Sequence, residues 1–365
     1  MRILMISRAR SWLEPPRLLR ALQDSGARTA YLAHCDSMLA HIRHADKRLN
    51  WSKNIAAHPQ DLYQALDEFE PDMLLPADEP AALWLHALYA LNDTPYAVCE
   101  LIARSLGDPA GFAPSTDKLA ITRMAQDLGI DTPLTSELQS NSDAGLFVHR
   151  HGWPVVIKSR RGFAGLGVYP CGTLSDLRHA HRNCPREGGR LIQIFTEGTT
   201  WMTAFVAARG EILAQICFAK LRQFPQHIGP SSIVRCRYDS GLQDATARMV
   251  KALGFSGFGS IDFQRCQDGR DLLLEFNPRP TPVCHLGRHL GVDLAAAFVD
   301  RKPRDSSQVL RDFPVALFPQ ELCRDSSGAG LEGCWHDLPS DEPELLKAMR
   351  HMLQPRAQRL VNSAN

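Results

Sequence analysis

The amino-acid sequence predicts an α/β domain at the N-terminus followed by a larger α+β region. Three observations predict this fold class. Strands alternate with helices over residues 1–98, a β-branched strand runs into a glycine-rich loop near residue 160, and two apolar runs flank an Asp-Gly turn at residues 268–269. Alternating strands and helices are typical of a parallel sheet with covered faces, whereas Asp-Gly between apolar runs is the strongest short-range signal for an antiparallel hairpin.

The N-terminal domain, residues 1–98, is predicted as a regular succession of elements. In order, we expect a strand over 2–6, a helix over about 14–23, a strand over 30–33, a helix over 61–69, a buried strand within PDMLLPADE and a helix over 80–91. This succession is Rossmann-like. No G-x-G-x-x-G motif follows the first strand, so we assign no dinucleotide to this domain.

The second region, residues 99–300, mixes hairpins with helices. Ser115 is the expected N-cap of a helix that continues through Leu128. Further along, we expect a strand in WPVVIKS, a strand from about 168, helices over 175–183 and 242–253, a strand in LIQIF and a hairpin around residues 209–210. Residues 301–365 form a weakly patterned C-terminal extension with one amphipathic helix near 343–353.

Composition narrows the class of partner. The 365 residues are 44% hydrophobic and 22% charged, with a formal net charge of +1. This balance is that of an ordinary globular protein and argues against a nucleic acid or a membrane surface as the main partner. The ten cysteines include no C-x-x-C pair, which indicates reduced thiols. With neither a signal-peptide core nor an apolar run of about 20 residues, we expect a cytoplasmic protein.

The Asp-Gly turn predicts the pairing of its two strands. A turn centred on residues 268–269 places 267 opposite 270, Asp262 opposite Glu275 and Ser260 opposite Asn277. Directly opposed side chains have Cβ atoms about 4.5–5.5 Å apart, and two like charges in such a pair are destabilising. A cation between the two carboxylates would relieve this repulsion.

Side-chain alternation supports a polar face on this hairpin. With period 2, one face of the second strand collects Leu273, Glu275 and Asn277, and the other collects Leu272, Leu274 and Phe276. Carboxylate and amide oxygens without His or Cys suit a hard ion such as Mg²⁺, which is usually held by one or two carboxylates and nucleotide phosphates. The sequence therefore predicts a magnesium site at Asp262, Glu275 and Asn277.

The glycine-rich loop carries a second candidate feature. Lys158 ends the strand before it, and the loop contains Gly162, Gly165 and Gly167. Backbone N–H groups of such a loop can approach phosphate oxygens closely, and a lysine can reach the same oxygens. The spacing is not that of a P-loop, and many glycine-rich loops are simple turns. Taken alone, this segment leaves both readings open.

Taken in order, these features resemble the ATP-grasp superfamily. The resemblance runs from about residue 100 to 300 and rests on Lys118 on a helix, Lys158 before a glycine-rich loop, LIQIFTEG as a strand and linker, and SIDF with LLLEFNPRP as an acidic hairpin. The preceding domain is similar to the pre-ATP-grasp domain that accompanies this family. The resemblance implies two α+β subdomains with ATP between them, the smaller one acting as a lid over about 120–192.

The resemblance also implies roles for individual residues. Lys118 and Lys158 would bind α- and β-phosphates, together with the loop glycines, and Lys220 would add a further phosphate contact. The hinge that meets the adenine would contain Gln193, Phe195 and Thr196. The hairpin residues Asp262, Glu275 and Asn277 would hold one or two Mg²⁺ ions, for which Mn²⁺ can substitute.

Two positions depart from the family pattern. Thr200 stands where several related ligases have an acidic residue for the ribose, with Glu197 nearby as an alternative. Ser260 stands where some members have a catalytic Arg, and Arg279 is the natural replacement, since its guanidinium can bind a carboxylate or an acyl phosphate bidentately. The alternative role for Arg279 is to brace the proline-rich loop.

The resemblance implies a carboxylate-amine ligase. ATP would phosphorylate a small-molecule carboxylate, and the acyl phosphate would pass to an amine with release of ADP and phosphate. Two alternatives stay open: activation of bicarbonate or another acceptor at the same site, and a non-catalytic ATP-binding module. By analogy we expect a homodimer. Cys284, His285, Arg235 and Arg237 are weaker candidates, for which packing or surface roles compete with substrate contacts.

Overall fold

The N-terminal unit is a parallel sheet with helices on both faces, as predicted. The computed structural model describes residues 1–162, 167–224, 229–307, 312–353, 355 and 358. The strands β1 (Arg2–Ile6), β2 (Arg28–Ala33), β3 (Lys47–Asn50) and β4 (Met73–Pro76) lie in the order β3-β2-β1-β4. Its helices are α1 (Pro15–Asp24), α2 (His58–Phe69), α3 (Glu79–Tyr89) and α4 (Tyr96–Leu106).

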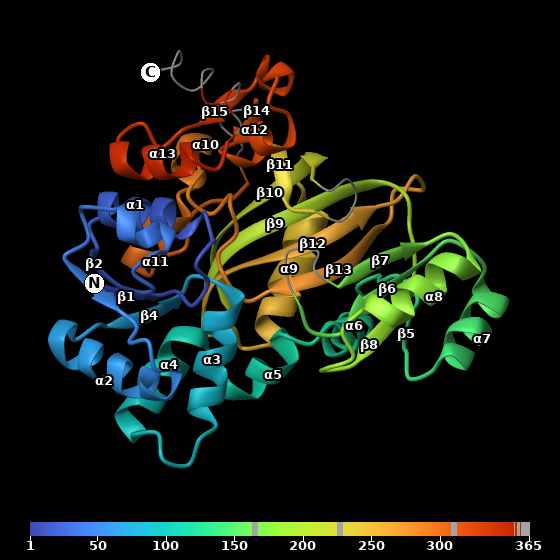
Figure 1. Cartoon of the computed structure of the whole chain (residues 1–365), viewed down its shortest axis with the longest axis horizontal. Coiled ribbons are helices and arrows are strands. Elements are labelled where there is room, and N and C mark those ends of the chain that lie inside the picture. The colour runs from blue at the N-terminus through green and yellow to red at the C-terminus, as the bar shows by residue number, and fades with distance from the viewer. Residues whose placement is uncertain (163–166, 225–228, 308–311, 354, 356–357, 359–365) are drawn as a thin grey trace.

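The two faces of this sheet belong to different cores. Ile3 and Met5 pack with α1 in a core that continues into the larger sheet of the chain, whereas Leu4 and Ile6 pack with α2, α3 and α4. Figure 1 shows α1 on one side of β1 and the other three helices on the opposite side. The boundary predicted at residue 98 falls inside α4, whose apolar residues are part of the second core. The first unit therefore continues beyond that boundary.

The largest sheet has seven strands in the order β13-β12-β9-β10-β11-β14-β15. Its strands are β9 (Thr199–Ala208), β10 (Glu211–Gln223), β11 (Ser231–Arg237), β12 (Gly257–Arg265), β13 (Asp271–Asn277), β14 (Pro314–Leu317) and β15 (Trp335–Asp337). Helices α6 (Lys118–Asp127) and α9 (Ser240–Ala252) share a core with one face. Helix α11 (Leu294–Asp300) and the N-terminal sheet share a core with the other. The C-terminal extension thus adds two strands to this sheet, which its weak pattern did not predict.

The smaller sheet is antiparallel, in the order β5-β8-β6-β7. It contains β5 (Thr135–Glu137), β6 (Val155–Ser159), β7 (Val168–Cys171) and β8 (Arg190–Ile194), and it packs against α7 (Asn141–His151) and α8 (Leu174–Asn183). In Figure 1 it lies beside the β12-β13 edge of the large sheet. The lid was predicted to begin at residue 120, which lies inside α6. Because Ile121 and Ala125 of α6 pack in the core of the large sheet, this helix belongs with the large sheet and not with the small one.

Short helices complete the chain. They are α5 (Phe112–Ser115), α10 (Gly287–Leu290), α12 (Gln320–Arg324) and α13 (Pro343–Arg350), with 3₁₀ turns at Met38–His41, Ile55–Ala57, Pro109–Gly111 and Ala329–Leu331. Among the described residues, no helix has the length and apolarity that a membrane crossing requires.

The start of α6 corrects one prediction. Ser115 is the last residue of α5, and Asp117 is the N-cap of α6 because its Oδ1 accepts hydrogen bonds from the N–H groups of Leu119 and Ala120. An aspartate at this position satisfies two amides that lack partners within the helix. It also fixes the helix start at Lys118, whose side chain then points into the site described below.

A buried ion-pair cluster joins the N-terminal unit to the C-terminal extension. Arg17 of α1 pairs with Asp337 of β15 and donates to the carbonyl of Phe318. Asp337 is also 3.0 Å from Nε2 of His285. The side chains of Arg17 and Asp337 are each 7% exposed, so removal of either charge would leave the other buried without its partner.

We expect Asp337→Ala to lower the free energy of unfolding by about 3–5 kcal/mol, because it leaves Arg17 as an unpaired buried cation. Urea denaturation followed by circular dichroism measures this change. Asp341→Ala is the control, since Asp341 is 59% exposed and its loss should change stability by about 0.5 kcal/mol or less. Equal effects of the two substitutions would contradict the structural role of the cluster.

Candidate active site

The acidic hairpin has the predicted pairing at its polar end. β12 and β13 place Asp262 opposite Glu275 and Ser260 opposite Asn277. The predicted pairing of 267 with 270 is wrong, because the Cys266 N–H donates to the Arg270 carbonyl and the loop over 267–269 is one residue longer than a two-residue turn. Gly269 in this loop has φ +86°, which is typical of a three-residue hairpin loop.

A β-bulge in β13 restores the predicted register. Asp262 pairs with Glu275, but Phe263 pairs with Leu273, so Leu274 is an extra, unpaired residue. A bulge changes which face the following side chains occupy. Leu273 is therefore buried in the core with Phe276, whereas Leu274 and Glu275 both line the cavity at this site. The predicted alternation is wrong for Leu273 and Leu274 and is confirmed for Glu275 and Asn277.

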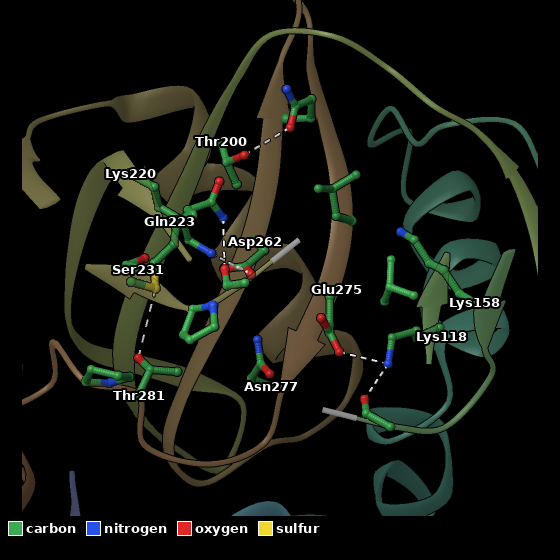
Figure 2. Close-up of a pocket in the computed structure, with 18 of the residues that line it drawn as sticks. Lys118, Lys158, Thr200, Lys220, Gln223, Ser231, Asp262, Glu275, Asn277 and Thr281 are labelled. Carbon is green, nitrogen blue, oxygen red and sulfur yellow. Dashed lines mark hydrogen bonds and ion pairs between the residues drawn. The ribbon is translucent and has the colours of Figure 1, made fainter. Parts of the chain in front are cut away.

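The hairpin forms one wall of a cavity of about 500 Å³ between the two sheets and the N-terminal unit. In Figure 2, Lys118 and Lys158 lie on one side, Lys220 lies on the other, and the hairpin carboxylates lie between them. Predicted site residues that line the cavity are Lys118, Lys158, Gly162, Gln193, Phe195, Thr196, Thr200, Lys220, Asp262, Glu275, Asn277 and Arg279. The structure thus brings together twelve of the fourteen predicted residues, drawn from both sheets.

The other two predicted residues are both glycines of the loop. Gly165 lies outside the described residues. Gly167 does not line the cavity; it has φ +77°, and its carbonyl accepts the N–H of Ser159 across the β6-β7 pair. Its conformation therefore has a structural explanation within the hairpin.

Each hairpin carboxylate is paired with a lysine. Lys118 Nζ lies 2.8 Å from Glu275 Oε1 and donates to the Gly162 carbonyl at 2.5 Å. Lys220 Nζ lies 2.7 Å from Asp262 Oδ2. The second oxygen of Asp262, Oδ1, is buried without a hydrogen-bond partner, and such an atom carries a desolvation cost unless a cation or donor reaches it.

These residues fit a hard divalent cation. The described residues include no cluster of three or more His, Cys, Asp or Glu side chains, so a metal here would rest on two carboxylates and the amide of Asn277. Mg²⁺ is characteristically bound in this way, with ligand phosphates and water completing its coordination. The buried Oδ1 of Asp262 is the atom that most needs such a partner.

Burial and charge shift the titration of two site residues. Burial lowers the pKa of Lys158 to about 8, while the charge of Glu275 raises this pKa and that of Lys118 lowers it. Burial raises the pKa of Glu275, but the charge and hydrogen bond of Lys118 and the charges of Lys158 and Arg279 outweigh it, so the pKa is lowered. Lys158 Nζ is held by Gln193 Oε1 at 2.6 Å.

Arg279 connects the hairpin to the N-terminal unit. It is 6% exposed, and its Nη2 donates to Asn277 Oδ1 at 3.1 Å, while its Nη1 donates to the Pro280 carbonyl at 3.2 Å. Its guanidinium lies 4.9 Å from the ring centre of Trp12, and its Nε is 3.6 Å from Glu79 Oε2. Arg279 therefore braces its own loop and also lines the cavity.

The weaker candidates have other partners. Arg235 and Arg237 both pair with Asp312. Cys284 is buried and accepts the Thr281 N–H, and His285 belongs to the Asp337 cluster. Ser260 and Glu197, the other two positions discussed for the family pattern, do not line the cavity. Ser260 is buried in the sheet, and Glu197 is exposed on the β8–β9 linker.

Sequence reasoning missed several lining residues. Trp12 and Glu14 follow the carboxyl end of β1 and line the cavity, a position at which open α/β sheets commonly bind ligands; that rule could have indicated them. Gln223, Ser231 and Gln264 also line it. Gln223 lies opposite Ser231 in the β10–β11 pairing, and Gln264 lies opposite Thr200 in the β12–β9 pairing. No local pattern marks these three residues.

No protein-family model matches the chain. Among curated proteins, it is 28% identical over 184 residues to a D-alanine–D-alanine ligase of Pseudomonas putida, which covers 47% of this chain and 57% of that protein. It is 24% identical over 216 residues to a D-alanine–D-alanine ligase of Bordetella petrii, covering 55% and 66%. The chain thus spans little more than half the length of the first of these relatives.

Solved structures share the fold at lower identity. Biotin carboxylase from Campylobacter jejuni has a TM-score of 0.65 at 15% identity, covering 81% of this chain and 70% of that one. N5-carboxyaminoimidazole synthetase from Staphylococcus aureus gives 0.66 at 13%, covering 85% and 81%, and L-amino acid ligase from Bacillus licheniformis gives 0.64 at 15%, covering 86% and 78%. The chain has the ATP-grasp fold. The N-terminal parallel unit, the large sheet and the small sheet correspond to the domain and the two subdomains that the sequence resemblance implied.

At this cavity, we expect Glu275→Gln to lower the pKa of Lys158 below about 8, because the Glu275 carboxylate raises that pKa. A neighbouring opposite charge commonly shifts a pKa by about 1 or more. Titration of the lysine side chains by heteronuclear NMR measures the change. Glu197→Gln, on the exposed linker, is the control and should leave the titration unchanged. A Lys158 pKa unaffected by Glu275→Gln would contradict the electrostatic coupling.

Proposed function

We propose that this ATP-grasp protein is an ATP-dependent ligase that activates a carboxylate as an acyl phosphate and joins it to an amine, with release of ADP and phosphate. The observation that carries the proposal is the cluster of Lys118, Lys158 and Lys220 around the opposed carboxylates Asp262 and Glu275, inside one cavity. Three cations facing two carboxylates suit a polyphosphate bound with a divalent metal. The names of the relatives by sequence support a carbon-nitrogen ligase.

The nucleotide would span the cavity between the two sheets. Val156, Ile194 and Leu274 give its lining an apolar part, which suits a base, and the adjoining hinge contains Gln193, Phe195 and Thr196. The triphosphate would extend toward the three lysines. Two of the structural neighbours support this placement, since they were solved as complexes with an ATP analogue and with ADP.

Asp262, Glu275 and Asn277 would hold Mg²⁺, as one ion or two, with Mn²⁺ as a substitute. When bound, the metal supplies positive charge that offsets the phosphate oxygens. Phosphoryl transfer depends mainly on positioning and on charge neutralisation. Lys118 and Lys220, now paired with the carboxylates, would then turn to phosphate, and Lys158 would contribute its charge from the β6 side.

The acceptor end of the cavity lies at the N-terminal unit. Arg279 provides a cation there and Glu14 provides a carboxyl group, both in the cavity lining. Burial raises the pKa of Glu14, and the charges of Arg279 and Arg17 partly oppose this. The pair of opposite charges suits a substrate carboxylate at Arg279 and an amine near Glu14. Closure of the small sheet over the site would exclude water, which would otherwise hydrolyse an acyl phosphate.

The bicarbonate route uses the same ATP site and is less favoured. Both relatives reported by sequence are named as ligases that join D-alanine to D-alanine, whereas the carboxylase likeness is one of fold alone. A non-catalytic ATP-binding module would bind ATP and magnesium without turnover. The cytoplasmic location, the homodimer and the absence of a nucleic-acid or membrane partner stay predictions.

A screen for ADP release over carboxylic acids tests the proposed function. Hydroxylamine replaces the unknown amine, because it traps an acyl phosphate as a hydroxamate. We expect one class of acid to give ADP, phosphate and hydroxamate in equal amounts. Release of AMP and pyrophosphate would contradict the acyl-phosphate route, and ADP release that requires bicarbonate but no organic acid would favour the alternative.

We expect Glu275→Gln to reduce turnover by about a hundredfold or more, because the amide keeps the shape of the side chain but loses the charge that holds a metal. Coupled ADP-release kinetics measure turnover, and thermal melting checks that the fold persists. Glu197→Gln is the matched control and should retain activity. Full activity of a folded Glu275→Gln protein would rule out the metal assignment.

Arg279→Lys should impair turnover more than ATP binding, because lysine keeps the charge but lacks the planar fork that binds a carboxylate bidentately. We expect kcat/KM for the acid to fall about tenfold or more, which is the size of a lost charge-assisted hydrogen bond. Kd for ATP should stay within about twofold of the wild-type value. Steady-state kinetics and calorimetric titration give the two quantities. A variant impaired only in ATP affinity would contradict the acceptor role.

A further inference from the structure

The C-terminal extension contributes one side chain to the cavity. Gln320, the first residue of α12, lines it, whereas every other described residue of the lining comes before residue 284. Gln320 Oε1 is buried and has no hydrogen-bond partner in the described part of the chain. A buried amide oxygen carries a desolvation cost unless a donor reaches it. The extension therefore brings an unsatisfied acceptor to the cavity.

Contacts on both sides of Gln320 hold the start of α12 in place. Arg17 of α1 donates to the carbonyl of Phe318, two residues before Gln320. Glu321, one residue after it, is 1% exposed and lies 3.4 Å from Arg222 Nη1 of β10. Gln320 thus stands on a backbone that is fixed by the N-terminal unit and by the large sheet.

These contacts place Gln320 at the end of the cavity proposed for the amine. Leu13 packs against the core that contains Phe318 and Leu322. Leu13 and its neighbour Glu14 both line the cavity. Gln320 lies between Phe318 and Leu322 in the sequence, so it borders the same segment as Glu14.

The hairpin of β10 and β11 also borders Gln320. Arg222, the partner of Glu321, precedes Gln223, which lines the cavity opposite Ser231. In Figure 1, α12 lies beside β14 and near β11, with which it is in contact. Gln320 therefore stands where the N-terminal unit, this hairpin and the C-terminal extension meet at the cavity.

We propose that Gln320 selects the amine substrate by accepting a hydrogen bond from a polar group that this substrate carries beyond its reacting nitrogen, an inference that rests on the ligase function proposed above. The terminal torsion of glutamine is broad, so the amide can turn its oxygen toward a ligand. An N–H or O–H group satisfies that oxygen. The nearby carboxyl of Glu14 also favours a donor or a cation over an anion at this place.

This contact distinguishes two classes of amine. An amine with a second N–H or O–H group, such as an amino alcohol or a diamine, can reach Gln320, whereas an alkylamine of equal length offers no donor. One neutral hydrogen bond is worth roughly two- to tenfold in an equilibrium constant, and a bond from a cation is worth more. Hydroxylamine carries no distant group, so its reaction should be independent of Gln320.

Steady-state kinetics of the full chain with magnesium-ATP and the acid found by ADP release test this inference. The amines are hydroxylamine and a series of amino alcohols and diamines, each compared with the alkylamine of equal length. We expect wild type to prefer the donor-bearing amines by roughly twofold to tenfold or more in kcat/KM. Gln320→Met should remove that preference and leave both the hydroxylamine reaction and Kd for ATP unchanged. Gln320→Glu retains an acceptor oxygen and should keep the preference.

Cys323→Ser, at an exposed position of α12, is the matched control and should behave as wild type. Thermal melting checks the fold of each variant, and Gln320→Leu gives a second apolar replacement if Gln320→Met does not fold. Equal losses with hydroxylamine and with the longer amines would overturn the inference, because Gln320 would then act through the fold. A loss confined to KM for the acid, or a wild-type protein without preference among the matched amines, would also overturn it.

Each of these outcomes leaves the ligase reaction in place, because ADP release with the acid and hydroxylamine continues. Failure of the wild-type protein to release ADP with any acid and hydroxylamine would instead contradict the proposed function, and the assignment of Gln320 with it.

Discussion

The opposition of Asp262 and Glu275 across the β12–β13 hairpin is the constraint on which the site depends. Two carboxylates in direct register repel each other and cost stability. The chain offsets this cost with Lys220 from β10, on the far side of β9 from β12, and with Lys118 from α6, each within ion-pair distance of one carboxylate. One buried oxygen, Asp262 Oδ1, still has no hydrogen-bond partner. Among the described residues, the hairpin therefore keeps one buried carboxylate oxygen that no protein donor reaches, as expected of a site that binds a cation.

The same constraint draws separate parts of the chain together. Lys118 is fixed at the first position of α6 by the Asp117 cap, and it reaches both Glu275 and the carbonyl of Gly162 next to the small sheet. The charge of Glu275 also raises the pKa of Lys158 on the small sheet. A change of charge on the hairpin is thus transmitted directly to the small sheet.

The sequence predicted the hairpin register from turn chemistry, because Asp-Gly between apolar runs restricts the strands to few pairings. It did not predict the bulge at Leu274. The extra residue in the loop shifts the strand pairing by one position, and the extra residue in β13 shifts it back, so Asp262 still lies opposite Glu275. Local patterns also predicted most N-terminal elements. They could not predict β14 and β15, which are only four and three residues long; β14 is held by pairing with the distant β11, and β15 by pairing with β14.

Residues from distant segments account for what was missed at the site. Thr200 was identified as a departure from the family pattern, but its partner Gln264 is 64 residues away and becomes apparent only from the β9–β12 pairing. Arg279 illustrates the same point at the acceptor end. Its guanidinium lies over Trp12 and near Glu79, which both belong to the N-terminal unit. Because that contact is buried, the N-terminal unit forms part of the cavity wall at the end proposed for the acceptor. Under the proposed function, the residues that select the substrate would therefore come from two units that no local motif connects.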